Sequence, residues 1–198
     1  MHLLSTLSGV ALIFGAVALP GSALADTKTF VSDQGHTEVL FGWDHVGITT
    51  QNGEFTQAVA TVKLEENLAD STVSVEIATD SVSSGFDKLD EHLKSSDFLD
   101  VEKYPTMTFV STGVEMTGDN TMNVTGDLTL HGVTKPVVLE TKLTLNGEHP
   151  LGKAIDYYKG DWIAVQATAE IDHQAFEVGQ FSTGPISITI NSEMKAAE

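Results

Sequence analysis

Apolar and polar residues alternate with a period of two along most of the chain. Five stretches show this alternation most clearly: residues 73–78, 122–130, 137–145, 163–172 and 186–191. The pattern is typical of antiparallel strands that are buried on one face and in contact with water on the other. A prediction of about eight strands is completed by three further segments, which are residues 36–43, 53–64 and 106–116.

Turn-forming residues separate the predicted strands. The clearest turn signals are Asn52-Gly53, residues 118–120 and Asn146-Gly147, because asparagine and glycine adopt the backbone angles that tight hairpins need. Several predicted strands reach about ten residues, which is long for a small β-sandwich and favours tilted strands in a closed barrel. We therefore predict an all-β fold, an eight-stranded antiparallel β-barrel.

One segment, from Ser83 to Asp100, departs from this alternation. Its apolar residues Phe86, Leu89 and Leu93 follow helical spacing, and the string Ser84-Gly85-Phe86-Asp87 is typical of a helix start with an acid at the third helical position. We predict one short connecting helix, followed by a turn over residues 96–100. Its apolar stripe either plugs one barrel end or forms a lid over an opening, and the sequence favours neither interpretation.

The amino terminus has the layout of a secretory signal peptide. An uncharged apolar run spans residues 5–19, and Ala23-Leu24-Ala25 forms an A-x-A cleavage pattern before the first acid, Asp26. The absence of a basic residue in Met1-His2 leaves a signal anchor open. We predict that residues 1–25 are removed, that residues 26–198 form one domain, and that the protein is periplasmic or secreted without stable insertion in a membrane.

The composition restricts the classes of partner. The chain has 198 residues, with 28 Asp and Glu against 10 Lys, no Arg and no Cys, for a net charge of −18. Such a negative surface repels nucleic acid and anionic lipid, so the charge favours neutral, apolar or cationic partners. Without cysteine there is no disulfide, thiolate metal site or thiol nucleophile.

An eight-stranded barrel is either filled by its own side chains or wide enough for one slender ligand. Strand alternation assigns nine apolar residues to the inner wall: Phe41, Phe55, Val75, Ile77, Phe109, Leu128, Leu139, Val165 and Ile188. A slip of one residue would reverse a strand's faces, and the side taken by Ala58, Ala60, Ala167 and Ala169 stays open. We add Leu93 and Phe98 as lid candidates, and His45 as a polar contact for a ligand head group.

The sequence contains no motif that predicts catalysis. It lacks the nucleophile elbow, the phosphate-binding loop and the dinucleotide-binding glycine pattern. The six histidines after residue 25 are scattered, with no pair at metal-ligand spacing, and their simplest role is structural. We therefore assign no catalytic residue, no metal site and no cofactor, and we predict that the protein is not an enzyme.

Several local strings match one known family. They are residues 36–41 (HTEVLF), His45 with Gly47, residues 53–55 (GEF), 90–100 (DEHLKSSDFLD), 103–109 (KYPTMTF) and 126–137 (GDLTLHGVTKPV). On these strings the chain resembles the YceI family of bacterial periplasmic or secreted polyisoprenoid-binding proteins, from His36 to about Glu193. The resemblance implies a lipocalin-like barrel, a helix bearing His92–Ser95 near one end, and an apolar tunnel occupied by a long isoprenoid or a similar amphiphile.

The sequence departs from this family near its carboxyl end. Where the family usually has an arginine followed by a Phe-Gly pair, the chain has Asp172-His173-Gln174-Ala175-Phe176-Glu177, with His173 at the arginine position. Where the family often has a Gly-Asp-Glu turn, the chain has residues 182–185 (STGP). Both departures bear on the identity of the ligand and the geometry of the tunnel mouth.

Pattern and resemblance together predict a function. We expect the protein to bind and shield a long apolar ligand, such as a polyisoprenoid, an isoprenoid quinone or a fatty amide, in a barrel tunnel. The alternative is a filled barrel that serves as a stress-response or interaction scaffold without a ligand. A homodimer stays open under either interpretation.

Overall fold

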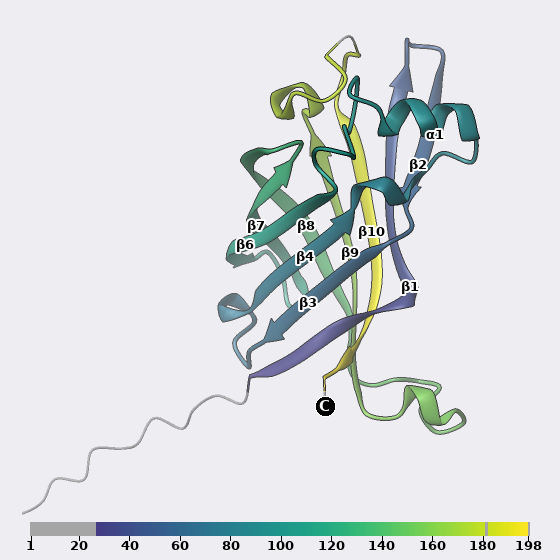
Figure 1. The fold of residues 1–198 in the computed structure, drawn as a ribbon. Coiled ribbons are helices and arrows are strands. Elements are labelled where there is room, and N and C mark those ends of the chain that lie inside the picture. The colour runs from purple at the N-terminus through teal and green to yellow at the C-terminus, as the bar shows by residue number, and fades with distance from the viewer. Residues whose placement is uncertain (1–26, 181, 198) are drawn as a thin grey trace, which may run out of the picture.

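The computed structural model describes residues 27–180 and 182–197 and shows an antiparallel β-barrel (Figure 1). Its strands are β1 (Lys28–His45), β2 (Thr49–Phe55), β3 (Ala58–Leu64), β4 (Thr72–Ala78), β5 (Val82–Ser83), β6 (Thr106–Met116), β7 (Thr121–Leu130), β8 (Val133–Glu148), β9 (Asp161–Ile171) and β10 (Ile186–Ala196). The helices are α1 (Asp87–Lys94) and four 3-10 turns, η1 (Leu68–Asp70), η2 (Thr79–Ser81), η3 (Asp156–Tyr158) and η4 (His173–Phe176). Within the described residues no helix has the length and apolarity to span a bilayer.

Eight of the strands close the barrel. They follow the order β1-β3-β4-β6-β7-β8-β9-β10, and β10 pairs with β1 to complete the ring. The first part of β1 pairs with β3 over residues 28–31, whereas its second part pairs with β2 over residues 39–45. The all-β, eight-stranded antiparallel prediction with one short helix is therefore confirmed.

Two of the predicted turns are wrong. Asn146 and Gly147 lie inside β8 and pair with Ile163 and Trp162 of β9, because a neighbouring strand holds the chain extended there. Likewise Asn52 and Gly53 lie inside β2 and pair with Gly42 and Phe41.

The β1–β2 turn falls instead at Val46 and Gly47, whose φ angles are 53° and 76°. The predicted strand over residues 53–64 is also two strands, because the chain leaves β2 after Phe55 and begins β3 at Ala58. Turn propensity alone missed these boundaries, since pairing with a neighbouring strand outweighs it.

The predicted helix forms, but it begins at Asp87, with Phe86 as its N-cap. The acid that closes its first turn is Asp90, whose Oδ1 accepts hydrogen bonds from the backbone N–H and the hydroxyl of Ser84, each at 2.6 Å. These bonds from Ser84 hold the pKa of Asp90 below its usual value. They anchor α1 at one end of the barrel, beside the β1–β2 hairpin (Figure 1).

β1 begins and β10 ends at the opposite end of the barrel (Figure 1), and large apolar side chains are buried there. Phe30 and Ile163 are each 1% exposed and Met194 is 3% exposed. Met194 pairs directly with Ile163, and Phe30 pairs with Val62. This end is therefore packed as an ordinary hydrophobic core.

Glu177, which ends η4, has a left-handed backbone with φ 62° and ψ 22°. A residue with a Cβ costs roughly 1–2 kcal/mol in this region, and glycine is the common residue at such helix ends. Replacing Glu177 with glycine is expected to raise the free energy of unfolding by about 1 kcal/mol, because glycine's extra chain entropy offsets part of the gain. Urea denaturation would measure this, and a Glu177→Ala control, which keeps the Cβ, should show no such gain.

Candidate ligand-binding cavity

A cavity of about 740 Å³ occupies the interior of the barrel. Its wall is formed by side chains from all eight barrel strands, from β2, from α1 and from the segments that follow α1 and η4. A barrel filled by its own side chains leaves no such space, so the premise of the filled-barrel alternative is wrong.

The structure places all twelve candidate residues in the wall of this cavity. Nine are the apolar strand residues Phe41, Phe55, Val75, Ile77, Phe109, Leu128, Leu139, Val165 and Ile188. Leu93 lies on α1, Phe98 lies in the turn after it, and His45 lies at the end of β1. The inward face of each strand is therefore the one assigned from the alternation, while contact of these residues with a ligand stays a prediction.

Small side chains keep the middle of the barrel open. Ala58, Ala60 and Ala167 lie in the cavity wall, which settles the side that the sequence left open for these three. Two aromatic rings also pack over glycines: a Cβ on Gly53 would collide with the ring of Phe41, and a Cβ on Gly126 would collide with the ring of Phe109. Each glycine gives its ring room against the wall, so the rings take less of the central space.

The cavity opens at the end that carries α1. Its exposed wall residues all come from the β1–β2 hairpin or from the loop before β10: Asp44, His45, Val46, Gln51 and Thr183. At the other end, wall residues Val62, Val124 and Met194 are buried. The cavity is therefore a pocket with its mouth between the hairpin and the loop that precedes β10.

Polar groups in the wall are few and mostly lie near the mouth. Within the part of the chain that the structure describes, Asp44 is the one carboxylate in the wall, and no lysine lies there. Deeper in, the hydroxyls of Thr37 and Ser192 form a hydrogen bond of 2.8 Å with each other and so satisfy one another. The wall is apolar along most of its length.

The sequence interpretation missed several wall residues. Val39 and Val73 share a face with the assigned residues of their own strands, so the same alternation could have identified them. His173, Ser182 and Thr183 belong to η4 and the following loop, where no periodic pattern exists. Only the departures from the resembled family had marked these positions as bearing on the tunnel mouth, and the structure places all three side chains in the wall.

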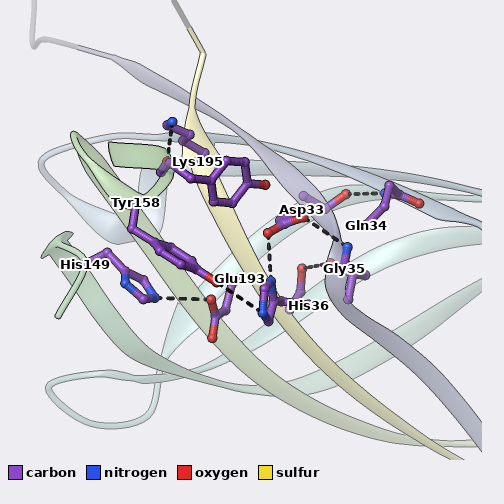
Figure 2. Close-up of polar contacts among 12 residues, drawn as sticks. Asp33, Gln34, Gly35, His36, His149, Tyr158, Glu193 and Lys195 are labelled. Atoms are coloured by element: carbon purple, nitrogen blue, oxygen red, sulfur yellow. Dashed lines mark hydrogen bonds and ion pairs between the residues drawn. The ribbon is translucent and has the colours of Figure 1, made fainter. Parts of the chain in front are cut away.

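A second group of side chains, drawn in Figure 2, lies outside the cavity wall and comes from β1, β10 and the β8–β9 connection. Nδ1 of His36 is 2.8 Å from a carboxylate oxygen of Asp33, and Nε2 of the same ring is 3.4 Å from the Tyr158 hydroxyl. Nε2 of His149 is 3.3 Å from a carboxylate oxygen of Glu193. Nowhere in the described chain do three His, Asp or Glu side chains form a group able to hold a metal ion.

Hydrogen bonds in this outer group shift two pKa values in opposite directions. Burial would raise the pKa of Asp33, but hydrogen bonds from His36, the Gly35 N–H and Tyr157 outweigh it and hold that pKa below its ordinary value of 3.8. The hydrogen bond with Asp33 raises the pKa of His36 above its ordinary value of 6.5. Asp33 and His36 are therefore an ion pair in mildly acidic solution.

This ion pair predicts a dependence of stability on pH. The stabilisation that His36 contributes to the folded state is fully present below pH 6.5 and is lost as the pH rises through the raised pKa of His36. The stabilisation that Asp33 contributes is present above pH 3.8 and is lost as the pH falls through the lowered pKa of Asp33. Because His36 is 44% exposed, solvent screens the pair and the effect is small. Between about pH 6 and pH 8.5, the melting temperature of the wild type should fall more than that of a His36→Gln variant. Parallel curves for the two proteins would contradict this.

Comparison with known proteins gives consistent results. Residues 30–196 match the family model of the YceI-like domain. A UPF0312 protein from Pseudomonas savastanoi pv. phaseolicola is 37% identical to this chain over 186 residues, which cover 93% of this chain and 92% of that protein.

Two solved structures share the fold. BcnA of Burkholderia cenocepacia matches with a TM-score of 0.69 and 22% identity, over 82% of this chain and 98% of that one. A polyisoprenoid binding domain from Saccharophagus degradans matches with a TM-score of 0.58 and 12% identity, over 87% of this chain and 100% of that one. At these identities the likeness is one of fold.

Proposed function

The chain belongs to the YceI-like domain family, and we propose that it binds and shields one long apolar molecule inside its barrel. The single observation that carries this proposal is the apolar cavity of about 740 Å³, open at one end and packed at the other. The polyisoprenoid binding domain of the same fold supports an isoprenoid chain as the occupant, and an isoprenoid quinone or a fatty amide has the same slender shape.

The volume bounds the length of chain that the cavity holds. If a carbon-sized group takes roughly 30 Å³, as a water molecule does in the liquid, then about 740 Å³ accommodates about 25 such groups. That corresponds to about five isoprene units. A longer chain would leave its remaining units at the mouth.

Burial alone provides enough free energy for binding. About twenty buried methylenes contribute roughly 16 kcal/mol at ~0.8 kcal/mol each, against association and ordering costs of roughly 4–15 kcal/mol. No charged anchor is needed, in agreement with the absence of lysine from the wall residues that the structure describes. With one carboxylate and few other acid–base groups in that wall, binding without a catalytic step is the simplest use of the cavity.

We also propose export of the protein to the periplasm or beyond the cell. Residues 1–25, the basis for this, lie outside the described residues. Amino-terminal sequencing of the protein recovered from the exported fraction should begin at Asp26, and an intact amino terminus in a membrane fraction would contradict removal of a signal peptide. The sequence left a homodimer open, and the mass of the native protein would test it.

The decisive experiment is to identify what the protein carries. Protein purified from its own exported compartment should release one apolar compound per chain in native mass spectrometry and organic extraction. Protein that carries nothing and also fails to take up a 20-carbon prenyl alcohol would contradict the proposal.

A further inference from the structure

One side chain in the cavity wall has an unused hydrogen-bonding atom. His173 is 5% exposed and begins η4, directly after β9. Its Nδ1 lies 2.7 Å from the backbone carbonyl oxygen of Val178, and because a carbonyl oxygen only accepts, Nδ1 carries the proton and donates. In the neutral form of an imidazole with its proton on Nδ1, Nε2 is an acceptor. Nε2 of His173 is buried with no partner among the described residues.

The position of this ring is well defined. His173, Phe98 and Val178 all lie in the wall of the cavity, toward the mouth at Ser182 and Thr183. Gly179 lets these groups approach one another, since a Cβ there would lie 2.9 Å from the Phe98 ring and 3.6 Å from Nδ1 of His173. The segment that follows η4 therefore holds the ring in a single orientation.

An unpaired buried acceptor is unfavourable unless something donates to it. Water that reached Nε2 would be displaced when an apolar chain fills the cavity. A ligand group that donates an N–H or O–H at this depth would satisfy the nitrogen, whereas a ketone, ether or ester would leave it unpaired.

The charges that face the cavity exclude a second class of head group. Among the described residues, Asp44 is the one carboxylate in the wall and no lysine lies there, and the sequence contains no arginine. A diphosphate or carboxylate buried here would lose its hydration without gaining a cationic partner, and at the mouth it would also face Asp44. An uncharged head group meets neither penalty.

We propose that the head group of the ligand is uncharged and donates a hydrogen bond to Nε2 of His173. This inference rests on the proposed function and narrows it to prenyl alcohols, quinols and primary amides, all of which carry an O–H or N–H beside a long apolar chain. It predicts that an oxidised quinone and a prenyl diphosphate bind more weakly than these donor-bearing molecules.

Three probes with the same 20-carbon prenyl chain test the proposal: geranylgeraniol, its methyl ether and its diphosphate. The wild-type protein should bind the alcohol about tenfold more tightly than the ether, as expected for one hydrogen bond to a buried acceptor. It should bind the diphosphate more weakly than the alcohol. Equal affinity for alcohol and ether, or tightest binding of the diphosphate, would overturn the proposal.

Variants of His173 separate the hydrogen bond from packing. In His173→Asn the amide N–H can still donate to the Val178 carbonyl, but nothing replaces Nε2, so the alcohol-to-ether preference should fall to within about twofold. His173→Gln, whose longer amide can present its oxygen near that position, should restore part of the preference. If His173 had a purely structural role, both substitutions would weaken the binding of all three probes equally and leave the alcohol-to-ether preference unchanged. That result would overturn the proposal.

Thr183 is one of several other polar residues near the mouth, and a Thr183→Val variant tests it. Loss of the preference for the alcohol in this variant, with the preference kept in His173→Asn, would overturn the assignment to His173. A Thr168→Val control, on the exposed outer face of β9, should bind all three probes as the wild type does. If primary amides or quinols show the same preference over their methylated forms, the donor is the shared feature. Failure of every probe to bind, the ether included, would count against the cavity as a binding site, whereas equal binding of alcohol and ether counts only against His173.

Discussion

Replacing Ala60 and Ala167 together with tryptophan is expected to lower the affinity for a 20-carbon prenyl alcohol at least about 100-fold. Both alanines lie in the cavity wall and are buried, so each indole would take space that the apolar chain needs. Displacement of about four methylenes from the cavity costs roughly 3 kcal/mol, and every 1.4 kcal/mol is about a tenfold change in affinity.

The measurement is titration of the alcohol followed by native mass spectrometry, which reports occupancy directly. Val59 and Thr168 provide a matched control, because each is the outward-facing, exposed neighbour of one of the two alanines. The Val59→Trp/Thr168→Trp double variant should bind as the wild type does. If the Ala60→Trp/Ala167→Trp variant remains folded and binds the alcohol within threefold of the wild type, the barrel interior is not the binding site.

Replacing Trp162 with alanine is expected to lower the free energy of unfolding by about 3–5 kcal/mol, the usual cost of truncating a buried tryptophan. Trp162 is fully buried, with 0% exposure, although it precedes the inward-facing Ile163 and so lies on the outer face of β9. The β8–β9 connection covers it: the rings of His149 and Tyr158 lie 5.2 and 5.4 Å from the indole, centre to centre. Since the free energy of unfolding of a domain is only about 5–15 kcal/mol, this loss would remove a large part of the stability of the protein.

Denaturant unfolding would measure the effect, and two further variants show its cause. Nε1 of Trp162 is buried without a partner among the described residues, so Trp162→Phe also removes an unsatisfied donor and should cost much less than alanine. Tyr157 is 52% exposed, and Tyr157→Ala should likewise cost less. A loss of under about 1 kcal/mol in Trp162→Ala would show that the connection does not depend on the indole.

The inward face of each strand could be predicted because the strand period of two is a local property. In β4, Val75 and Ile77 lie in the cavity wall and Glu76 between them is exposed, as the alternation indicates. The helix after β5 was predictable for a similar reason, although Asp90 and not Asp87 is the acid that bonds back to Ser84. Hairpin turns were less predictable, since pairing with β9 keeps Asn146-Gly147 in a strand despite its turn propensity.

The candidate polar groups could not be predicted because distant segments supply them. His36 meets Tyr158 across 122 positions of the chain, and His149 meets Glu193 across 44. His173 was notable in the sequence only as the residue at a position where the resemblance implies arginine. Only the structure identifies Nε2 of His173 as the unpaired acceptor, because it shows that Nδ1 donates its hydrogen bond to the Val178 carbonyl oxygen.

The amino-acid sequence by itself determined the all-β class, the antiparallel pattern and the apolar face of each strand, because these depend on neighbours two residues apart. It also determined the negative charge of −18 and the absence of arginine. Only the tertiary structure decided that the interior holds a cavity, since that depends on how eight strands close and how the rings of Phe41 and Phe109 pack over Gly53 and Gly126. The fold alone also placed the mouth, by bringing the β1–β2 hairpin, α1 and the segment after η4 to one end of the barrel (Figure 1).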